Sequence, residues 1–405
     1  MTIAIIGAGA SGMAAALQAA WHEAQVTLFE RNSLVGRKLL VTGSGRCNIT
    51  NGAAAAEKYA CADPSWMASL LDRFDVSDLL SMLDDIGIPV YKTADDWYYP
   101  LSNSAQGVVD AFANALALAG IALQTSTLVT AILSRPGGFL LRYRQGDEKK
   151  EAFYEKVVVS AGGMAYPALG SRGELFPILE QLGHTVSPKR PALAPVLADL
   201  GELYPLQGVR LDAGVSLWDG NRRLAATAGN LIFTPWGLNG PAVMDLSHHI
   251  SANPQRRLSL SLNLLQLCQI EFDGLLNQKR AAPYPLKVLL GAFFPPKVAP
   301  VYLKMAQLRE DSRLSQVKET NLDRLVEKLK DTRLPVKGVR DFEYCQVSAG
   351  GVPVGEVNPL TMESCRIKGL YLTGETLDVV GPCGGYNLQY AFSSGAVAGL
   401  AAAAR

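Results

Sequence analysis

The sequence predicts an α/β fold in which both chain ends contribute to one parallel sheet, interrupted by a β-rich insert and a small helical segment. Three observations predict it. Residues 2–30 follow a strand, turn, helix and strand pattern, residues 156–163 form an apolar run typical of a central parallel strand, and residues 369–399 return to strand, glycine turn and helix. A chain of 405 residues that is 48% hydrophobic can bury the cores of about two or three domains.

The first element is a glycine-rich turn between a strand and a helix. Gly7, Gly9 and Gly12 have G-x-G-x-x-G spacing, and the next β-rich run ends at Glu30. The first glycine allows a tight turn, the second lets a pyrophosphate approach the main chain, and the third lets the helix pack on the strand. The helix N-terminus offers N–H groups to phosphates, and the acid accepts the hydroxyls of an adenosine ribose. This pattern predicts a Rossmann-like unit that binds FAD or NAD in preference to NADP, whose 2′-phosphate the acid repels.

A loop rich in glycine and cations follows, over residues 34–51. Amides freed by Gly43 and Gly45, together with the charges of Arg37, Lys38 and Arg46, could surround a pyrophosphate from the side opposite the first helix. The alternative is a solvated basic loop.

The middle of the chain divides by composition. A proline-dense stretch, Ser187–Pro195, marks a domain boundary, and a β-rich and then a leucine-rich helical segment follow it. The predicted domains are 1–188 and 351–405 for the two parts of the nucleotide-binding domain, 189–253 for the β-rich insert, 254–332 for a helical subdomain and 333–350 for a return strand of the insert.

The last segment favours a flavin over a nicotinamide as the resident cofactor. Residues 369–375 predict a strand that ends in Gly374 and Glu375, and a glycine turn from Gly381 opens a helix. The acid can hold ribityl hydroxyls, and a helix N-terminus at the pyrimidine edge of the isoalloxazine stabilises negative charge on reduced flavin. The alternative is an ordinary C-terminal helix after a glycine turn.

The composition of the chain limits the classes of partner and cofactor that we expect. The net charge is +1, from 38 basic and 37 acidic residues, so no overall field attracts nucleic acid or an anionic membrane, and a small-molecule substrate is expected. The six cysteines include no C-x-x-C pair, so we expect neither a metal site nor a dithiol centre. The chain shows neither a signal-peptide pattern nor a run of about twenty apolar residues, so we expect a cytoplasmic protein with no membrane span.

Several motifs together resemble the BaiN/YhiN-like family of NAD(P)/FAD-dependent oxidoreductases. They are Gly7–Gly12, Gly36–Lys38, Gly45–Asn51, Ala161–Pro167, Leu182–Thr185, Phe233–Thr234, Gly240–Ala242, Gly374–Glu375 and Gly384–Gln389. The resemblance implies a glutathione-reductase-type FAD-binding domain with an inserted β-barrel-like domain and a small helical domain. Together with the motifs it gives the expected cofactor-binding residues: Gly7, Gly9, Ala10, Ser11, Gly12, Glu30, Arg31, Arg37, Lys38, Gly45, Arg46, Cys47, Asn48, Val129, Ala161, Gly162, Gly163, Gly374, Glu375, Gly384, Gly385, Tyr386, Asn387 and Leu388.

The resemblance also implies the reaction class. It implies hydride transfer between FAD and a small organic substrate, with NAD(P)H as a transient donor for reduction of a conjugated C=C of an enone, steroid-like or bile-acid-like. The alternatives are an O₂-dependent oxidase of aminoacetone-like amines, a flavoprotein that acts on a macromolecule such as tRNA, and an isomerase without net redox change. Ala165, Ser171–Glu174 and Asn239 depart from the family pattern, so the substrate does not carry over. No residue stands out as the catalytic acid, and Tyr166, Cys383 and Tyr386 are candidates that equally suit packing.

Overall fold

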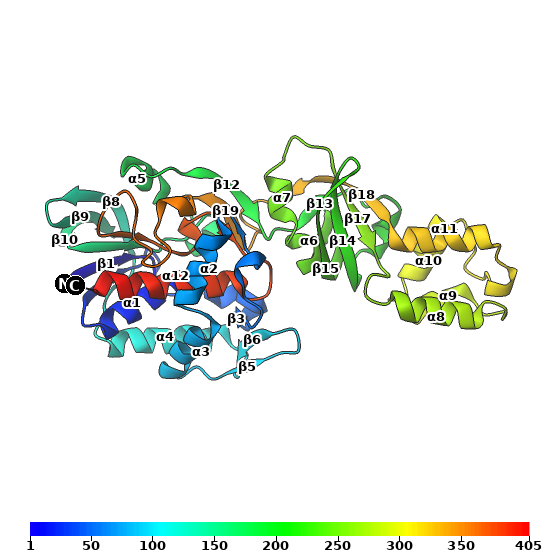
Figure 1. Ribbon diagram of the computed structural model, residues 1–405, viewed down its shortest axis with the longest axis horizontal. Helices are drawn as coiled ribbons and strands as arrows, with labels where there is room; N and C mark the ends of the chain where they lie inside the picture. Colours follow the sequence, from blue (N-terminus) through cyan, green and yellow to red (C-terminus); the bar gives the residue numbers. More distant parts are fainter. Residues whose placement is uncertain (405) are drawn as a thin grey trace. The chain divides into compact units, whose positions relative to one another are not determined.

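The computed structural model describes residues 1–404, which form two compact units (Figure 1). The first unit combines Met1–Arg190 with residues 346–404, and the second is Pro191–Cys345. The chain therefore leaves the first unit two residues later than the sequence predicts and returns to it five residues earlier.

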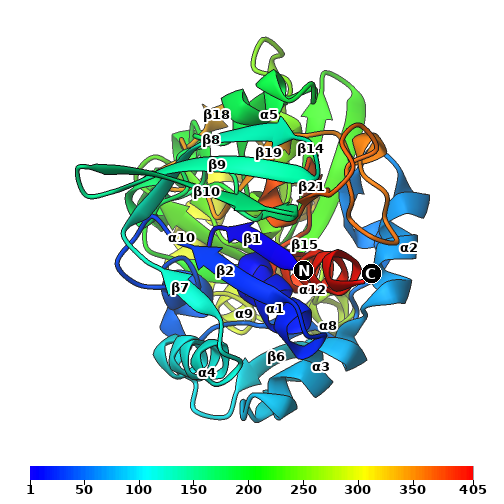
Figure 2. The ribbon, with the colours of Figure 1, turned by 90° about the vertical axis from the view of Figure 1, so that its left-hand side faces the viewer.

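A five-stranded sheet with the order β20-β11-β1-β2-β7 forms the centre of the first unit, and all its neighbouring strands are parallel. The central strands β11 and β1 are buried apolar runs because helices and a second sheet cover their faces, whereas the edge strand β7 is largely exposed. Figure 2 views this sheet from the left of Figure 1. The strands are β1 (Thr2–Ile6), β2 (Gln25–Phe29), β7 (Ala122–Gln124), β11 (Lys156–Val159) and β20 (Leu370–Leu372).

The helices from the two chain ends lie side by side, α1 (Ala10–Trp21) against α12 (Tyr386–Ala403) (Figures 1 and 2). Their backbones approach closely because the contact uses glycine: a Cβ at Gly395 would lie 2.1 Å from the carbonyl oxygen of Ser11, and a Cβ at Gly399 would lie 2.3 Å from that of Ala15. The two ends of the sequence thus form one packed body.

Smaller elements complete the first unit. An antiparallel sheet packs Tyr143 and Tyr154 against Phe29, with ring centroids 5.1 Å and 6.0 Å away. The strands of this antiparallel sheet are β8 (Thr127–Arg135), β9 (Gly138–Gln145) and β10 (Glu148–Tyr154). The strands of the smaller sheets are β3 (Thr50–Asn51), β4 (Ala60–Cys61), β5 (Val90–Lys92), β6 (Trp97–Pro100), β12 (Ser187–Ala192), β19 (Val347–Gly351) and β21 (Val379–Val380). The helices are α2 (Pro64–Arg73), α3 (Val76–Asp85), α4 (Ala105–Leu118) and α5 (Phe176–Gln181).

The second unit is a closed antiparallel barrel, and the helices of residues 269–330 gather on one side of it (Figure 1). The barrel order is β13 (Val196–Ala198), β16 (Gly237–Asn239), β15 (Arg222–Thr234), β14 (Arg210–Asp219), β17 (Leu258–Asn263) and β18 (Thr332–Val339). The helices are α6 (Pro241–Met244), α7 (Ser247–Ser251), α8 (Gln269–Lys279), α9 (Leu286–Gly291), α10 (Val298–Met305) and α11 (Glu319–Lys330). None of the helices within residues 1–404 is long and apolar enough to cross a bilayer.

Three local expectations need correction. The segment 254–332 is not wholly helical, because β17 at its start closes the barrel between β14 and β18. The apolar run 156–163 is a strand only as far as Val159, where β11 ends, and its last four residues belong to the following loop. The proline-dense boundary is itself a strand, β12, which forms a two-stranded sheet with β19; an edge position of this kind tolerates proline.

Candidate flavin site

The carboxyl edge of the parallel sheet gathers the sequence motifs. β1 is followed by Gly7–Gly12, β2 by Glu30, β11 by Ala161–Gly163, and β20 by Gly374–Glu375. Because these strands are parallel, their following loops meet at one edge, which is where open α/β sheets bind ligands.

The three glycines of the first turn have different surroundings. A Cβ at Gly12 would lie 1.8 Å from the carbonyl oxygen of Gly7, and a Cβ at Gly7, whose φ is +104°, would lie 2.4 Å from that of Ser160. Apart from its two chain neighbours, no described residue has an atom within 4 Å of a Cβ built on Gly9. The protein's own packing therefore demands glycine at the first and third positions, while the second leaves open backbone that a phosphate can approach.

The N-termini of α1 and α12 differ from those of α2, α3 and α4. Asp63, Asp75 and Ser104 cap α2, α3 and α4 through their side chains. In the described chain, α1 and α12 begin after Gly9 and Gly385 without a side-chain cap and without an acidic residue in the first turn. Their first-turn N–H groups and positive dipole ends thus suit a pyrophosphate and the electron-rich edge of a reduced flavin.

Glu30 is buried at the end of β2 and is held by the backbone around it. Its Oε2 accepts from the Ala8 amide at 2.9 Å, and its Oε1 accepts from the backbone amide and side-chain Nδ2 of Asn32, at 2.8 Å and 2.7 Å. A carboxylate accepts about four hydrogen bonds, so one place remains on Oε2. Glu30 can accept one ribose hydroxyl as it stands, and a second only if Asn32 shares or yields its place.

The cations near Glu30 are engaged with protein groups. Arg37 Nη1 donates to Asn32 Oδ1 at 3.0 Å, and Arg31 forms an ion pair with Glu174. Arg31 therefore fastens the loop that follows β11. Val129, which we expect near the adenine end, is buried in β8.

Glu375 lies at the centre of a hydrogen-bond cluster. Lys38 Nζ lies 2.6 Å from its Oε2, and the amide and hydroxyl of Ser348 donate to its Oε1 at 2.7 Å and 2.9 Å. A Cβ at Gly163 would lie 2.1 Å from Ser348 Oγ and 2.7 Å from Glu375 Oε1, so glycine is required there. The sequence motifs do not include Ser348, and only its closeness in space to Glu375 reveals it.

The basic loop adopts left-handed backbone at Gly43, Ser44, Gly45 and Cys47, with φ values of +55°, +58°, +85° and +62°. Arg46 is exposed, with its guanidinium carbon 4.6 Å from the Tyr99 ring centroid.

The Cys47 side chain is fully buried, and burial raises the pKa of its thiol to about 11, so it is neither a ready nucleophile nor a side-chain ligand for a cofactor. Asn48, in the amide orientation that satisfies both its atoms, donates to the carbonyls of Thr50 at 3.1 Å and Tyr98 at 3.3 Å.

The two family motifs at opposite chain ends fit each other directly. Asn51 Nδ2 donates to the Gly384 carbonyl at 2.9 Å, and the Thr50 hydroxyl donates to Gln389. A Cβ at Gly385 would lie 2.4 Å from the Thr50 carbonyl oxygen. Asn387 closes the turn by accepting from the Gly381 amide and donating to its carbonyl, both at 2.8 Å.

The three candidate acids lie on two segments. Cys383 and Tyr386 belong to the turn that opens α12, and the Tyr386 carbonyl accepts from the Tyr59 hydroxyl at 2.9 Å. Tyr166 lies on the loop after β11 with left-handed backbone, φ 57° and ψ 63°, an uncommon conformation for a bulky residue. Leu388, another expected contact, is half-buried on α12. Within the described residues, no group of three or more His, Cys, Asp or Glu could hold a metal ion.

Comparison with known proteins agrees with this geometry. The family described as HI0933-like protein Rossmann domain matches residues 1–401. The chain is 34% identical to a 3-dehydro-bile acid delta(4,6)-reductase of Clostridium scindens, over 100% of this chain and 99% of the relative. It is 31% identical to a ribosomal RNA dihydrouridine synthase of Escherichia coli, over 96% and 95%.

The fold is also that of solved flavoenzymes. A 3-ketosteroid-delta4-(5alpha)-dehydrogenase from Rhodococcus jostii, solved with 4-androstene-3,17-dione, aligns with a TM-score of 0.54 at 14% identity, over 100% of this chain and 96% of that one. The chain belongs to the HI0933-like family of FAD-dependent oxidoreductases and is a flavoprotein oxidoreductase with an FAD-binding Rossmann fold.

Proposed function

We propose that the protein reduces a carbon–carbon double bond conjugated to a carbonyl group, with NAD(P)H as the electron source. This proposal rests on two relatives that align with nearly the whole chain, because both names describe saturation of a carbon–carbon double bond. A 3-dehydro-bile acid has a ketone conjugated to its Δ4 bond, and dihydrouridine is uridine whose C5–C6 bond, conjugated to the C4 carbonyl, has been saturated. When the bond next to the carbonyl is saturated, which is Δ4 in the first molecule and C5–C6 in the second, a hydride adds to the β carbon and a proton adds to the α carbon.

The chain's own residues support such chemistry by holding FAD, which supplies a hydride donor at N5 when bound and reduced. We assign the pyrophosphate to the open backbone at Gly9 and the first turn of α1, the adenosine ribose to Glu30, and the ribityl hydroxyls to Glu375. The N-terminus of α12 would stabilise negative charge on the reduced flavin. Tyr166, Cys383 and Tyr386 are the candidates for the group that gives the proton to the α carbon.

The substrate class that we favour is a small enone, such as a steroid-like ketone. It is the substrate class of the 34% identical relative. The test is to reduce the bound flavin anaerobically with NADH or NADPH and to follow its reoxidation by enones, by O₂ and by uridine-containing RNA. We expect nicotinamide to reduce the flavin and an enone to reoxidise it with one equivalent of saturated ketone formed.

Other outcomes of that experiment overturn the proposal. Reduction of the flavin by simple amines and by neither nicotinamide would identify an amine oxidase. Double-bond migration without steady consumption of NAD(P)H or O₂ would identify an isomerase.

A specific observation favours uridine in RNA as a second candidate substrate. Between Pro191 and Cys345 the chain has 19 Lys and Arg against 15 Asp and Glu, a net charge of +4, whereas the remainder has 19 against 22, a net charge of −3. The near-neutral total therefore conceals a basic second unit. The expectation that the protein has no nucleic-acid partner rested on the total alone, and one relative acts on ribosomal RNA.

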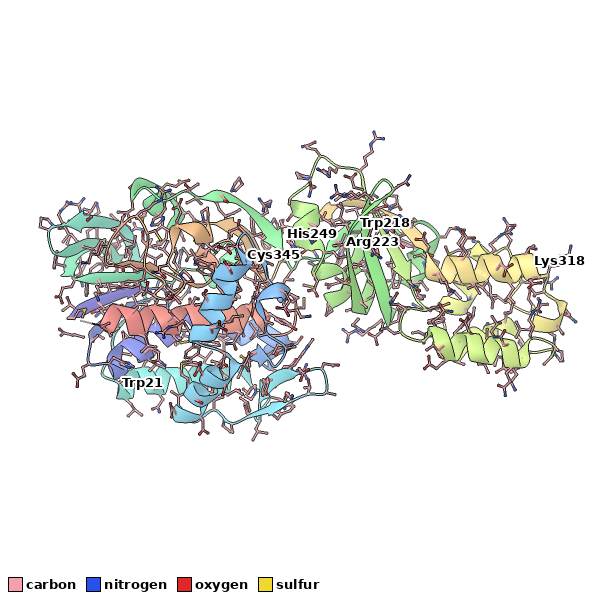
Figure 3. The ribbon with its side chains drawn as sticks, in the orientation of Figure 1. Trp21, Trp218, Arg223, His249, Lys318 and Cys345 are labelled. Atoms are coloured by element: carbon pink, nitrogen blue, oxygen red, sulfur yellow. The ribbon has the colours of Figure 1, made fainter. Side chains whose placement is uncertain are left out.

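The second unit also exposes aromatic side chains beside arginines. Arg340 lies between Trp236 and Tyr344, which are 41% and 43% exposed, with its guanidinium carbon 4.7 Å and 3.1 Å from their ring centroids. On the barrel, Arg333 covers Trp218 at 4.1 Å, and Trp218 pairs across the hairpin with Arg223 (Figure 3). Unpaired bases stack on such surfaces, and arginines beside them meet phosphates.

RNA binding across a range of salt concentrations decides between the two substrates. If RNA is the substrate, retention falls steeply with salt, a uridine-containing RNA gains 2 Da per reduced base, and Trp236→Ala weakens retention by about tenfold. Arg309→Ala is the matched control, because Arg309 is highly exposed in the same unit and pairs only locally with Asp311. If RNA neither binds the protein nor reoxidises its flavin, RNA is excluded and the enone remains the proposed substrate.

A further inference from the structure

The two connections between the units run through one pair of strands. The chain leaves the first unit within β12 and re-enters it at Gln346, directly before β19, and these two strands form a sheet of their own. The strands are in close backbone contact: a Cβ at Gly350 would lie 2.3 Å from the carbonyl oxygen of Pro188. A change in β19 therefore reaches both connections.

β19 is bound along its length to the turn that carries Glu375. The Ser348 amide donates to Glu375 Oε1 at 2.7 Å, the Gly350 amide donates to Asp378 Oδ1 at 2.7 Å, and the Val352 amide donates to the Thr376 carbonyl at 3.0 Å. Donors from alternate residues of this segment thus face the turn that we assign to the ribityl chain.

The Ser348 side chain adds a second link. Ser348 is 1% exposed; its hydroxyl donates to Glu375 Oε1 at 2.9 Å and accepts from the Met164 amide at 3.0 Å. Met164 follows Ala161–Gly163 in the loop after β11, so one hydroxyl joins the loops after β11 and β20. With Lys38 on Oε2, the Glu375 carboxylate is held from both sides, and one oxygen keeps acceptor capacity for a ligand.

We propose that Ser348 is a positioning residue that sets the Glu375 carboxylate for FAD, and that FAD binding at Glu375 in turn stabilises the β12–β19 strand pair. The inference rests on the flavin site proposed above. Its physical basis is linkage: a ligand that binds one arrangement of Glu375 stabilises every group that holds that arrangement. Ser348 acts through Glu375 and does not itself touch the cofactor.

The first test is a double-mutant cycle with the dissociation constant of FAD as the readout, measured by flavin fluorescence on the full-length protein after removal of its flavin. Ser348→Ala removes the hydroxyl and keeps the backbone bond, and we expect about tenfold weaker binding. Because Ser348 acts through Glu375, we expect Ser348→Ala to add less than about twofold in a Glu375→Gln background. Ser81→Ala, on an exposed helix surface of the same unit, is the control and leaves FAD affinity unchanged.

The second test is amide hydrogen exchange with and without FAD. In the wild type, FAD slows exchange at the amides of Ser348 and Gly350 by about tenfold or more, and Glu375→Gln abolishes that slowing. If Ser348→Ala fails to fold, hydrogen exchange in Glu375→Gln, whose side chain is the size of glutamate, still tests whether FAD binding at Glu375 stabilises the strand pair.

Unchanged FAD affinity in Ser348→Ala, additive losses in the double variant, or equal exchange with and without FAD would each overturn the inference. Neither readout involves substrate, so a failure here is distinct from a failure to reduce enones or RNA.

Discussion

Substitutions at two glycines of the first turn should distinguish a glycine that the protein's own packing requires from one that cofactor binding requires. In Gly12→Ala the new methyl group would lie 1.8 Å from the Gly7 carbonyl oxygen, and α1 and β1 must separate by about 1.6 Å to reach an ordinary contact of 3.4 Å. Overpacking against backbone costs about 3 kcal/mol, which for a unit of this size lowers Tm by about 6–12 °C. This variant should be unstable with or without FAD.

Gly9→Ala should behave in the opposite way. Gly9 has φ −82°, which alanine adopts freely, and no described residue other than its chain neighbours lies within 4 Å of its Cβ position. The apoprotein should therefore lose no more than about 1 kcal/mol through the weaker N-cap. The methyl group occupies the approach of the pyrophosphate, so the loss of one or two charge-assisted hydrogen bonds should weaken FAD binding by about ten- to a hundredfold. Differential scanning calorimetry of the apoprotein and flavin titration measure the two effects. An apoprotein Tm as low as that of Gly12→Ala, or wild-type affinity for FAD, would refute the assignment of Gly9.

Three further predictions concern stability and the ribose end of the site. Gly395→Ala places a methyl group 2.1 Å from the Ser11 carbonyl and should lower both Tm and FAD affinity, whereas Gly107→Ala, with its nearest neighbour at 3.6 Å, should lower neither. Burial raises the pKa of Glu356, but hydrogen bonds from Arg366, Thr185 and His184 outweigh it and bring the pKa to about 2 from 4.5. Glu356 therefore stabilises the fold above pH 4.5 and loses this effect as the pH falls towards 2, so the deficit of Glu356→Gln in urea unfolding should be largest near neutral pH and shrink in acid. Glu30→Ala should weaken FAD binding by about tenfold or more and should also destabilise the apoprotein, because it leaves the Ala8 amide without its acceptor; unchanged flavin content would count against Glu30 as the ribose ligand.

The sequence was most informative where local pattern and local chemistry coincide. The apolar runs of β1 and β11 are buried on both faces, Gly12 is required by its contact with Gly7 within the turn itself, and Gly7 has the positive φ that glycine favours. Such features depend on neighbours a few residues away or on burial alone, so periodicity and residue type predict them. The antiparallel hairpins of β8, β9 and β10 were predictable for the same reason, from glycines at their turns.

Features that depend on distant partners could not be predicted in this way. β17 has the alternating pattern of a strand, but it lies beside leucine-rich helices, and its partner β18 comes almost seventy residues later. Ser348 resembles any small residue of a strand until Glu375 is placed beside it. Arg31 is expected to bind the cofactor, and its ion pair with Glu174, which the loop after β11 brings close, depends on the fold. Single-sequence reasoning identifies a residue's chemistry but not the partner that folding gives it.

The pairing of the two family motifs explains why this fold needs both chain ends. Asn51 bonds the carbonyl of Gly384, and Gly385 leaves room for the carbonyl of Thr50, so the N-terminal motif shapes the turn from which α12 begins. That turn has left-handed glycines at its start and no side-chain cap among the described residues, so the contact with Thr50 and Asn51 fixes where the first-turn N–H groups of α12 point. A flavin ring placed at this helix terminus is therefore positioned by residues from both motifs at once. Damage to Asn51 should change the environment of the flavin ring as much as damage to the turn itself, although Asn51 lies more than three hundred residues away in sequence.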